Sequence, residues 1–136
     1  TGKPLTKEEM ILQSERVYNY ERIFNLRMGK GRRIHHNIPD RALGPVFPDE
    51  WNARPEYFDG KLEEAGVSPK GLSVEEKISA LLKFRRAQWE KLVDAVYLRR
   101  GWSSDGIPTL ETVRRLKIDL PEVLQVLEKA ASRTEA

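Results

Sequence analysis

The residues whose types could do chemistry include one pair of adjacent histidines, His35 and His36. Adjacent side chains diverge on a helix and point to opposite sides of a strand, so this pair is poorly placed to chelate one metal ion. No carboxylate stands at a recognised ligand spacing from them. We therefore expect a surface or interface role for both histidines rather than a metal site. The chain contains no cysteine, which excludes a disulfide, a thiolate zinc site and a cysteine-ligated iron–sulfur cluster within it.

A second candidate is the basic, glycine-containing loop that runs from Arg27 to Arg33. Backbone amides and arginines in such a loop can hold a phosphate or a nucleic-acid backbone. The loop lacks the spacing of a P-loop and has no interleaved aromatic side chains on which bases stack. We favour a solvated loop, or one paired with acidic residues of another domain. Nothing resembles a nucleophile–base pair or a carboxylate dyad, so we predict no catalytic, cofactor-binding or metal-ligating residue.

One six-residue pattern occurs twice in the stretch from Glu15 to Arg27, first as Glu-Arg-Val-Tyr-Asn-Tyr and then as Glu-Arg-Ile-Phe-Asn-Leu. Six residues are not a multiple of the helical period, so equivalent positions of the two copies point about 240° apart. The apolar residues consequently go nearly all the way round the helix, which is typical of an interior helix.

Buried charge is costly unless it is paired, so we predict that the polar side chains of this stretch form a structural network. Its members are Glu15, Arg16, Asn19, Glu21, Arg22, Asn25 and Arg27. By helical spacing, Glu15 can pair with Arg22, and Glu21 with Asn25. Two alternatives stay open: a solvated helix face, and direct contact with a cofactor or substrate.

The elements that position these residues are all predicted to be helical. Capping boxes at Thr6 and Ser73 begin two long helices, which end near Met28 and at Gly101. Thr109 and Pro121 begin two shorter C-terminal helices. Residues 30–72 are dense in glycine and proline and predict an irregular strap, with a short helix near Gly60 to Ala65. No strand pattern occurs, so the predicted fold class is all-α.

The length of 136 residues predicts one domain, 1–136, with a hydrophobic fraction of 39% and a charged fraction of 33%. The net charge of +3 supports no nucleic-acid partner. No apolar run approaches the roughly 18 residues of a membrane span, and no signal peptide precedes the first helix. We therefore expect a cytoplasmic location and no membrane partner, and the start at Thr1 suggests a processed protein or a fragment.

Two long motifs and a short one between them resemble those of the tungsten-containing aldehyde:ferredoxin oxidoreductases. Glu15 to Arg27 resembles the family helix ER-x-x-N-x-ER-x-F-N-x-R, and Ile38 to Arg41 resembles its LP-x-R. Residues 97–109 resemble Y-x-x-RGW-x-x-x-GIPT, and the matching positions are Tyr97, Arg100, Gly101, Trp102, Gly106 and Pro108. The motifs occur in the family's order and lie in its extreme C-terminal part. One departure is Lys117, which stands where the family has a glycine and affects only the C-cap of that helix.

The resemblance implies a parent enzyme that oxidises aldehydes to carboxylic acids at tungsten, or molybdenum, held by two pterins. Electrons would leave through one [4Fe–4S] cluster to ferredoxin. This chain would be the helical C-terminal fragment, inactive alone, which packs against the N-terminal and middle domains and helps to enclose the cofactors. The same domain of a tungsten-dependent benzoyl-coenzyme A reductase is one alternative. A free-standing helical interaction module that uses the basic loop is another.

Overall fold

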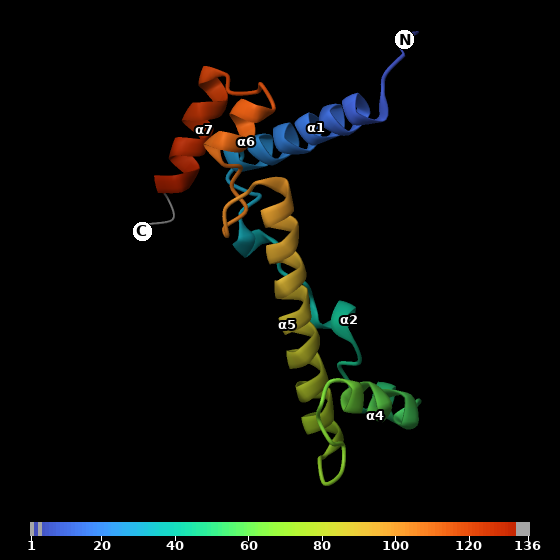
Figure 1. The fold of residues 1–136 in the computed structure, drawn as a ribbon. Helices are drawn as coiled ribbons and strands as arrows, with labels where there is room; N and C mark the ends of the chain where they lie inside the picture. The colour runs from blue at the N-terminus through green and yellow to red at the C-terminus, as the bar shows by residue number, and fades with distance from the viewer. Residues whose placement is uncertain (1, 3, 133–136) are drawn as a thin grey trace. The chain divides into compact units, whose positions relative to one another are not determined.

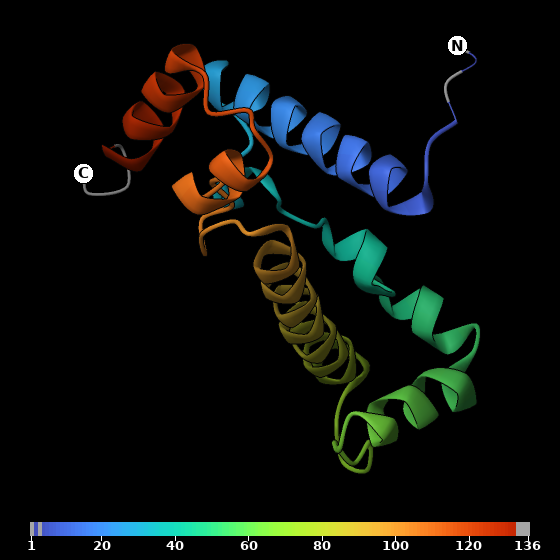
Figure 2. The same ribbon diagram turned by 45° about the horizontal axis from the view of Figure 1, so that its top comes forward.

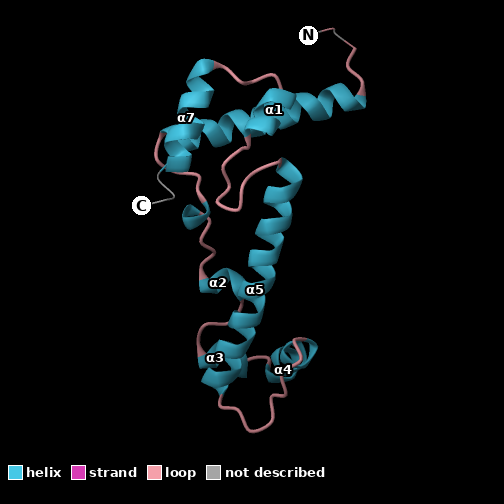
Figure 3. Ribbon diagram, turned by 60° about the vertical axis from the view of Figure 1, so that its left-hand side comes forward, coloured by secondary structure: helices cyan, strands magenta, loops and turns pink. Residues whose placement is uncertain are grey.

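The structure, a computed structural model, describes residue 2 and residues 4–132 as helices joined by loops (Figures 1 and 3). No β-strand forms within this part of the chain, and one isolated bridge joins Trp102 to Pro108. The prediction of an all-α fold is confirmed. The elements are α1 (Lys7–Arg27), η1 (Arg33–His35), α2 (Asp40–Leu43), α3 (Pro48–Asn52), α4 (Pro55–Glu64), α5 (Val74–Arg100), α6 (Leu110–Arg115) and α7 (Pro121–Ser132).

The two long helices begin and end where local sequence signals predict. At the start of α1, the Thr6 amide donates to Glu9 at 2.8 Å, and the Glu9 amide donates to the Thr6 hydroxyl at 3.2 Å. Ser73 and Glu76 form the same reciprocal pair at the start of α5, with distances of 2.8 and 3.2 Å. Gly101, with φ at +68°, follows the last residue of α5. Both predicted capping boxes are confirmed.

The segment from 30 to 72 is more helical than the irregular strap that the sequence predicts. It contains η1, α2, α3 and α4, and α4 begins five residues before the predicted short helix. The reason is the position of the prolines, since Pro48 and Pro55 occupy the first position of α3 and α4. Proline lacks only an amide hydrogen that is unpaired at this position, so it begins a helix rather than breaking it.

The chain divides into two compact units, unit 1 from Thr1–Asn37 with Asp94–Ala136, and unit 2 from Ile38–Val93. The prediction of a single domain stays a prediction. Unit 2 has a core of Trp51, Leu62, Ile78 and Leu81. Trp51 donates its indole hydrogen to Asp59 at 3.1 Å, and Lys77 binds the same carboxylate at 2.9 Å. These bonds fix α3 and α4 against the N-terminal part of α5.

Unit 1 holds a separate core between α1, α6 and α7, which lie together in Figures 1 and 2. Its buried residues are Ile23, Leu26, Ile107, Val113, Leu116, Ile118, Val123, Leu127 and Ala130. The stripe on α7 comes from Val123, Leu127 and Ala130, at the spacing of one helix face. These contacts hold α1 along one side only.

The expectation that α1 is buried all round stays a prediction, because the residues of this chain cover only one face of the helix. Asn19, Arg22, Ile23 and Leu26 are its buried residues. On other faces, Val17, Phe24 and Met28 are each more than half exposed. The cause is the number of partners, because α6, α7 and the turn before α6 cover one face of the helix and leave the rest in water.

A membrane span would need a long, apolar helix, and none of the helices in the described ranges meets both conditions.

Candidate functional site

Arg22 lies at the centre of a hydrogen-bonded cluster in unit 1 and is only 6% exposed. Its Nε donates to the carbonyl oxygen of Gly106 at 2.7 Å. Its Nη1 lies 2.7 Å from His36 Nε2, and its Nη2 donates to the Tyr97 hydroxyl at 3.3 Å. The planar guanidinium has donors in fixed directions, so one side chain joins α1, η1's C-cap and α5 to the turn before α6.

The partners of His36 determine its tautomer. A guanidinium can only donate, so His36 Nε2 must accept from Arg22. A neutral imidazole then carries its hydrogen on Nδ1, which donates to the Tyr97 hydroxyl at 2.5 Å. The Tyr97 oxygen therefore accepts from both His36 and Arg22. This arrangement requires the neutral form of His36, since protonation would turn Nε2 into a second donor facing Arg22.

The indole of Trp102 forms one wall of the cluster. Its Nε1 donates to Asn19 Oδ1 at 2.9 Å, and Asn19 Nδ2 donates to the Glu15 carbonyl at 2.9 Å. The guanidinium carbon of Arg22 lies 4.5 Å from the centroid of the Trp102 ring. A cation over an aromatic face is stabilised by the ring quadrupole, and more strongly where water is excluded. Trp102 therefore replaces part of the hydration that Arg22 loses on burial.

Burial and charge act together on the two titratable groups of the cluster. Burial lowers the pKa of the Arg22 guanidinium, and the hydrogen bond with Tyr97 and the charge of Asp105 act in the opposite direction. Burial also lowers the pKa of His36, and the nearby positive charges of Arg22 and His35 lower it further. Both effects on His36 favour the neutral imidazole that the hydrogen bonds require.

The turn that carries the Gly-Trp and Gly-Ile-Pro motifs closes against α1. Gly106 has φ at +78° and is buried, and a Cβ placed there would lie 2.0 Å from Arg22 Nη2. At Gly101 a Cβ would lie 2.0 Å from Thr112 Oγ1, whose hydroxyl donates to the Gly101 carbonyl at 2.8 Å. Pro108 is buried beside these glycines. Both glycines are therefore required by close approach as well as by backbone conformation.

The first copy of the doubled pattern binds the end of α6. Arg16 Nε donates to the Leu116 carbonyl at 2.8 Å, and Arg115 binds the Glu15 carboxylate at 2.8 Å. Leu116 is the C-cap of α6, so Arg16 supplies a donor to one of the carbonyls that the helix leaves unpaired. Glu15 therefore pairs with Arg115, and the predicted pair of Glu15 with Arg22 does not form.

The structure separates other members of the predicted network from this cluster. Glu21, Asn25 and Arg27 are exposed within this chain, so their burial stays a prediction. No hydrogen bond joins Glu21 to Asn25 within the described residues. Arg100, from the second motif, lies beside the cluster, with its guanidinium carbon 3.8 Å from the Tyr18 ring centroid and 5.8 Å from the Trp102 ring centroid. The second copy of the pattern thus contributes Arg22 alone to the polar cluster.

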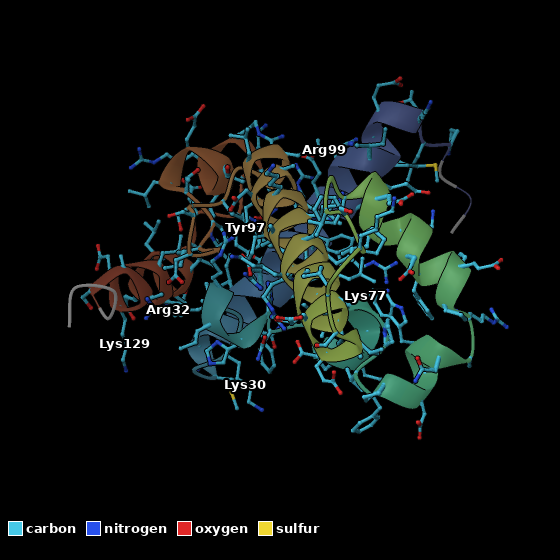
Figure 4. The ribbon with its side chains drawn as sticks, turned by 90° about the horizontal axis from the view of Figure 1, so that it is seen from below. Lys30, Arg32, Lys77, Tyr97, Arg99 and Lys129 are labelled. Atoms are coloured by element: carbon cyan, nitrogen blue, oxygen red, sulfur yellow. The ribbon has the colours of Figure 1, made fainter. Side chains whose placement is uncertain are left out.

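His36 is the member of the cluster that sequence reasoning missed. Its contacts, Arg22 and Tyr97, come from distant parts of the chain, and no spacing in the sequence connects them. The basic loop is also held more firmly than a solvated loop. Arg32 forms an ion pair with Asp105, and Arg33 forms one with Asp94 (Figure 4 labels Arg32 and Tyr97). Arg32 and Arg33 of the basic loop are therefore paired with carboxylates within unit 1.

The chemistry available to this cluster is that of a scaffold. Its donors and acceptors are paired with one another, and no buried side-chain nitrogen or oxygen in the described part of the chain lacks a partner. Among residues 2 and 4–132, no group of three histidine, aspartate or glutamate side chains is placed to hold a metal ion. The arrangement fixes α1, the end of α5 and the turn before α6 to one another.

Residues 1–118 match the model of a protein family described as aldehyde ferredoxin oxidoreductase, domains 2 and 3. The matched range includes every member of the Arg22 cluster. Comparison with curated proteins gives no significant match, and comparison with solved structures gives none either.

Proposed function

Because the chain belongs to the aldehyde ferredoxin oxidoreductase family over residues 1–118, we propose that it is the helical C-terminal domain of a longer tungsten-pterin oxidoreductase. Its role there is structural: it packs against the N-terminal and middle domains and helps to enclose the cofactors. The parent enzyme oxidises an aldehyde to a carboxylic acid and passes the electrons to ferredoxin. The isolated chain has no such activity.

The observation that carries this proposal is an apolar stripe on α1 that faces away from the core of unit 1. Val17, Phe24 and Met28 repeat at intervals of seven and four residues, so they share one helix face, and each is more than half exposed. Tyr20 lies beside them and is also exposed. Burying one such side chain stabilises a structure by about 1.5–3 kcal/mol. An apolar stripe of this kind is a packing surface for another domain.

The family's cofactors do not fit the residues of this chain. A [4Fe–4S] cluster needs cysteine thiolates, and the sequence contains none. The described residues also hold no cluster of side chains suited to a metal ion. The parent's tungsten-pterin and its iron–sulfur cluster therefore belong to other parts of the polypeptide in this proposal, and no step of the reaction is assigned to residues here.

The alternative of a free-standing module that binds acidic partners through the basic loop has less support. Arg32 and Arg33 already bind Asp105 and Asp94 within unit 1. A polyanion would have to compete with both carboxylates. The other alternative, a benzoyl-coenzyme A reductase-like parent, concerns the substrate, which lies outside this chain in either case.

The test compares two exposed positions in the longer polypeptide encoded by the natural reading frame. Phe24→Asp places a charge in the stripe, and Leu98→Asp places one at an apolar side chain of α5 that is 82% exposed and lies outside the stripe. In the isolated chain, both variants should unfold at the same denaturant concentration as the wild type. In the longer protein, only Phe24→Asp should lower protease resistance and bound tungsten.

Three results would contradict the proposal. The first is a reading frame that does not continue into a cysteine-containing region upstream. The second is bound tungsten or iron together with aldehyde oxidation by the isolated chain. The third is a longer protein that tolerates Phe24→Asp as well as Leu98→Asp.

A further inference from the structure

A groove of about 720 Å³ runs between α1 and the C-terminal end of α5, within unit 1. Met10, Ile11 and Tyr18 line it from α1, and Val96 lines it from α5. These four side chains are exposed, although each is apolar or aromatic. Met10 lies seven residues before Val17 and borders the exposed stripe of α1, whereas Ile11 and Tyr18 lie on a different side of the helix from that stripe.

Positive charge borders the groove. Lys7 and Arg99 are exposed at its edge, and Arg100 lies over the Tyr18 ring (Figure 4 labels Arg99). No carboxylate of the described chain pairs with Lys7 or Arg99. The single acid of the lining, Glu15, is bound to Arg115. The groove therefore offers an apolar floor and three cations, with its one negative charge already neutralised.

The openness of the groove to solvent bears on the kind of occupant. A small amphiphile binds well where 70–90% of its surface is buried, and this groove is open to solvent. A helix laid along the groove would bury its apolar face and keep its polar face wet. Carboxylates at the margins of that apolar face would lie opposite Lys7, Arg99 and Arg100.

We propose that this groove, between α1 and the end of α5, docks an acidic amphipathic helix presented by a separate protein. Exposed charges at the rim of a binding surface chiefly raise the rate of encounter and favour partners of the opposite charge. That effect operates on a partner that arrives by diffusion. The inference does not depend on the proposed function, because the groove and its charges belong to this chain alone.

The experiment uses the full 136-residue chain and two labelled helical peptides of about 14 residues, about 21 Å long. One peptide has leucines at intervals of three and four with glutamates at the margins, and its twin has lysine at every glutamate. Fluorescence anisotropy at low salt should give at least tenfold tighter binding of the acidic peptide. Higher salt should weaken this binding several-fold.

Charge reversal at the rim identifies the site. Arg99→Glu should weaken binding of the acidic peptide about tenfold and should strengthen binding of its lysine twin. The matched control is Arg114→Glu, which reverses an exposed arginine of α6 outside the groove and should change neither affinity. Both substitutions are at exposed positions, so circular dichroism should show unchanged folding.

Four outcomes would overturn the proposal. In the peptide experiment, these are equal binding of the two peptides and no binding of either peptide at low salt. In the variant, they are an affinity for the acidic peptide that Arg99→Glu leaves unchanged, and self-association of the chain that Arg99→Glu abolishes. Micromolar binding of decanoate without binding of the acidic peptide would identify a small-molecule groove instead.

Discussion

Arg22 Nε donates a 2.7 Å hydrogen bond to the carbonyl oxygen of Gly106, which lies 84 positions further along the chain. The bond joins the second Glu-Arg of the doubled pattern to the glycine of the Gly-Ile-Pro-Thr motif. Two motifs that are separate in sequence are thus parts of one contact. The close fit requires a residue without a side chain at position 106, because the guanidinium occupies the place of a Cβ.

Gly106→Ala should destabilise the chain by about 3 kcal/mol or more, since the new methyl meets Arg22 and a left-handed backbone at once. Gly29→Ala is the matched control. Gly29 has φ at +77° but no atom within 4 Å of a built Cβ, so backbone strain alone should cost about 1 kcal/mol. Urea denaturation measures both. Equal losses would show that the close approach at Gly106 contributes nothing.

Arg22→Ala should cost about 3 kcal/mol of the free energy of unfolding, because it leaves the Gly106 carbonyl and His36 Nε2 without their donor. Arg22→Lys should recover only part of this loss, since one ammonium does not reproduce the planar fork. Arg27→Ala, at an exposed position of the same helix, should change stability by no more than about 0.5 kcal/mol. A comparable effect at positions 22 and 27 would argue against the cluster.

Stability should depend on pH through His36. Its folded pKa is lowered, chiefly by burial and then by the charge of Arg22, whereas the unfolded value is about 6.5. Above that value both states are neutral and the stabilisation is complete. As the pH falls below about 6.5, the unfolded chain binds the proton first, so stability decreases until the folded pKa is passed.

His36→Gln tests this dependence, because glutamine offers an acceptor to Arg22 and a donor to Tyr97 but does not titrate. Denaturation between pH 7 and pH 5 should show a smaller decrease for this variant than for the wild type. His35→Gln serves as the control and should keep most of the wild-type decrease, because His35 contributes less to the lowered pKa of His36 than burial and Arg22 do. A decrease that persists unchanged in His36→Gln would assign it to another group.

Lys117→Gly should stabilise the chain by about 1 kcal/mol. Lys117 has φ at +56° after the C-cap of α6, a conformation that an L-residue with a Cβ adopts at a cost. Lys129→Gly, inside α7, should instead destabilise by about 1 kcal/mol. Thermal denaturation of the two variants, with shifts of opposite sign, would establish the role of the backbone conformation.

The parts of the fold that depend on neighbours in sequence were predictable. Thr6, Ser73 and Thr109 begin helices through bonds to residues three positions away, and Gly101 ends α5 through its own backbone conformation. The departure from the family pattern at Lys117 was visible in the sequence for the same reason, because a C-cap depends on neighbouring residues. Such signals act over one turn of helix and survive in any context.

The parts that depend on distant partners were not predictable. The helical periodicity of α1 indicates which residues share a face, but not how many faces are covered by other elements. It therefore did not distinguish buried Arg22 from exposed Glu21. His36 joins the cluster only because η1 brings it to Arg22 and Tyr97. These contacts follow from the path of the chain, which local patterns do not contain.

The division of unit 1 into two stretches of sequence has a consequence for the newly made chain. The hydrogen bond of Arg16 cannot form until Leu116, 100 positions later, has been synthesised. At about 5–20 residues per second, synthesis leaves α1 without that partner for roughly 5–20 s. Unit 2 is one continuous segment and can fold in that interval. Within this chain, the apolar residues of α1 therefore stay exposed for the whole of that interval.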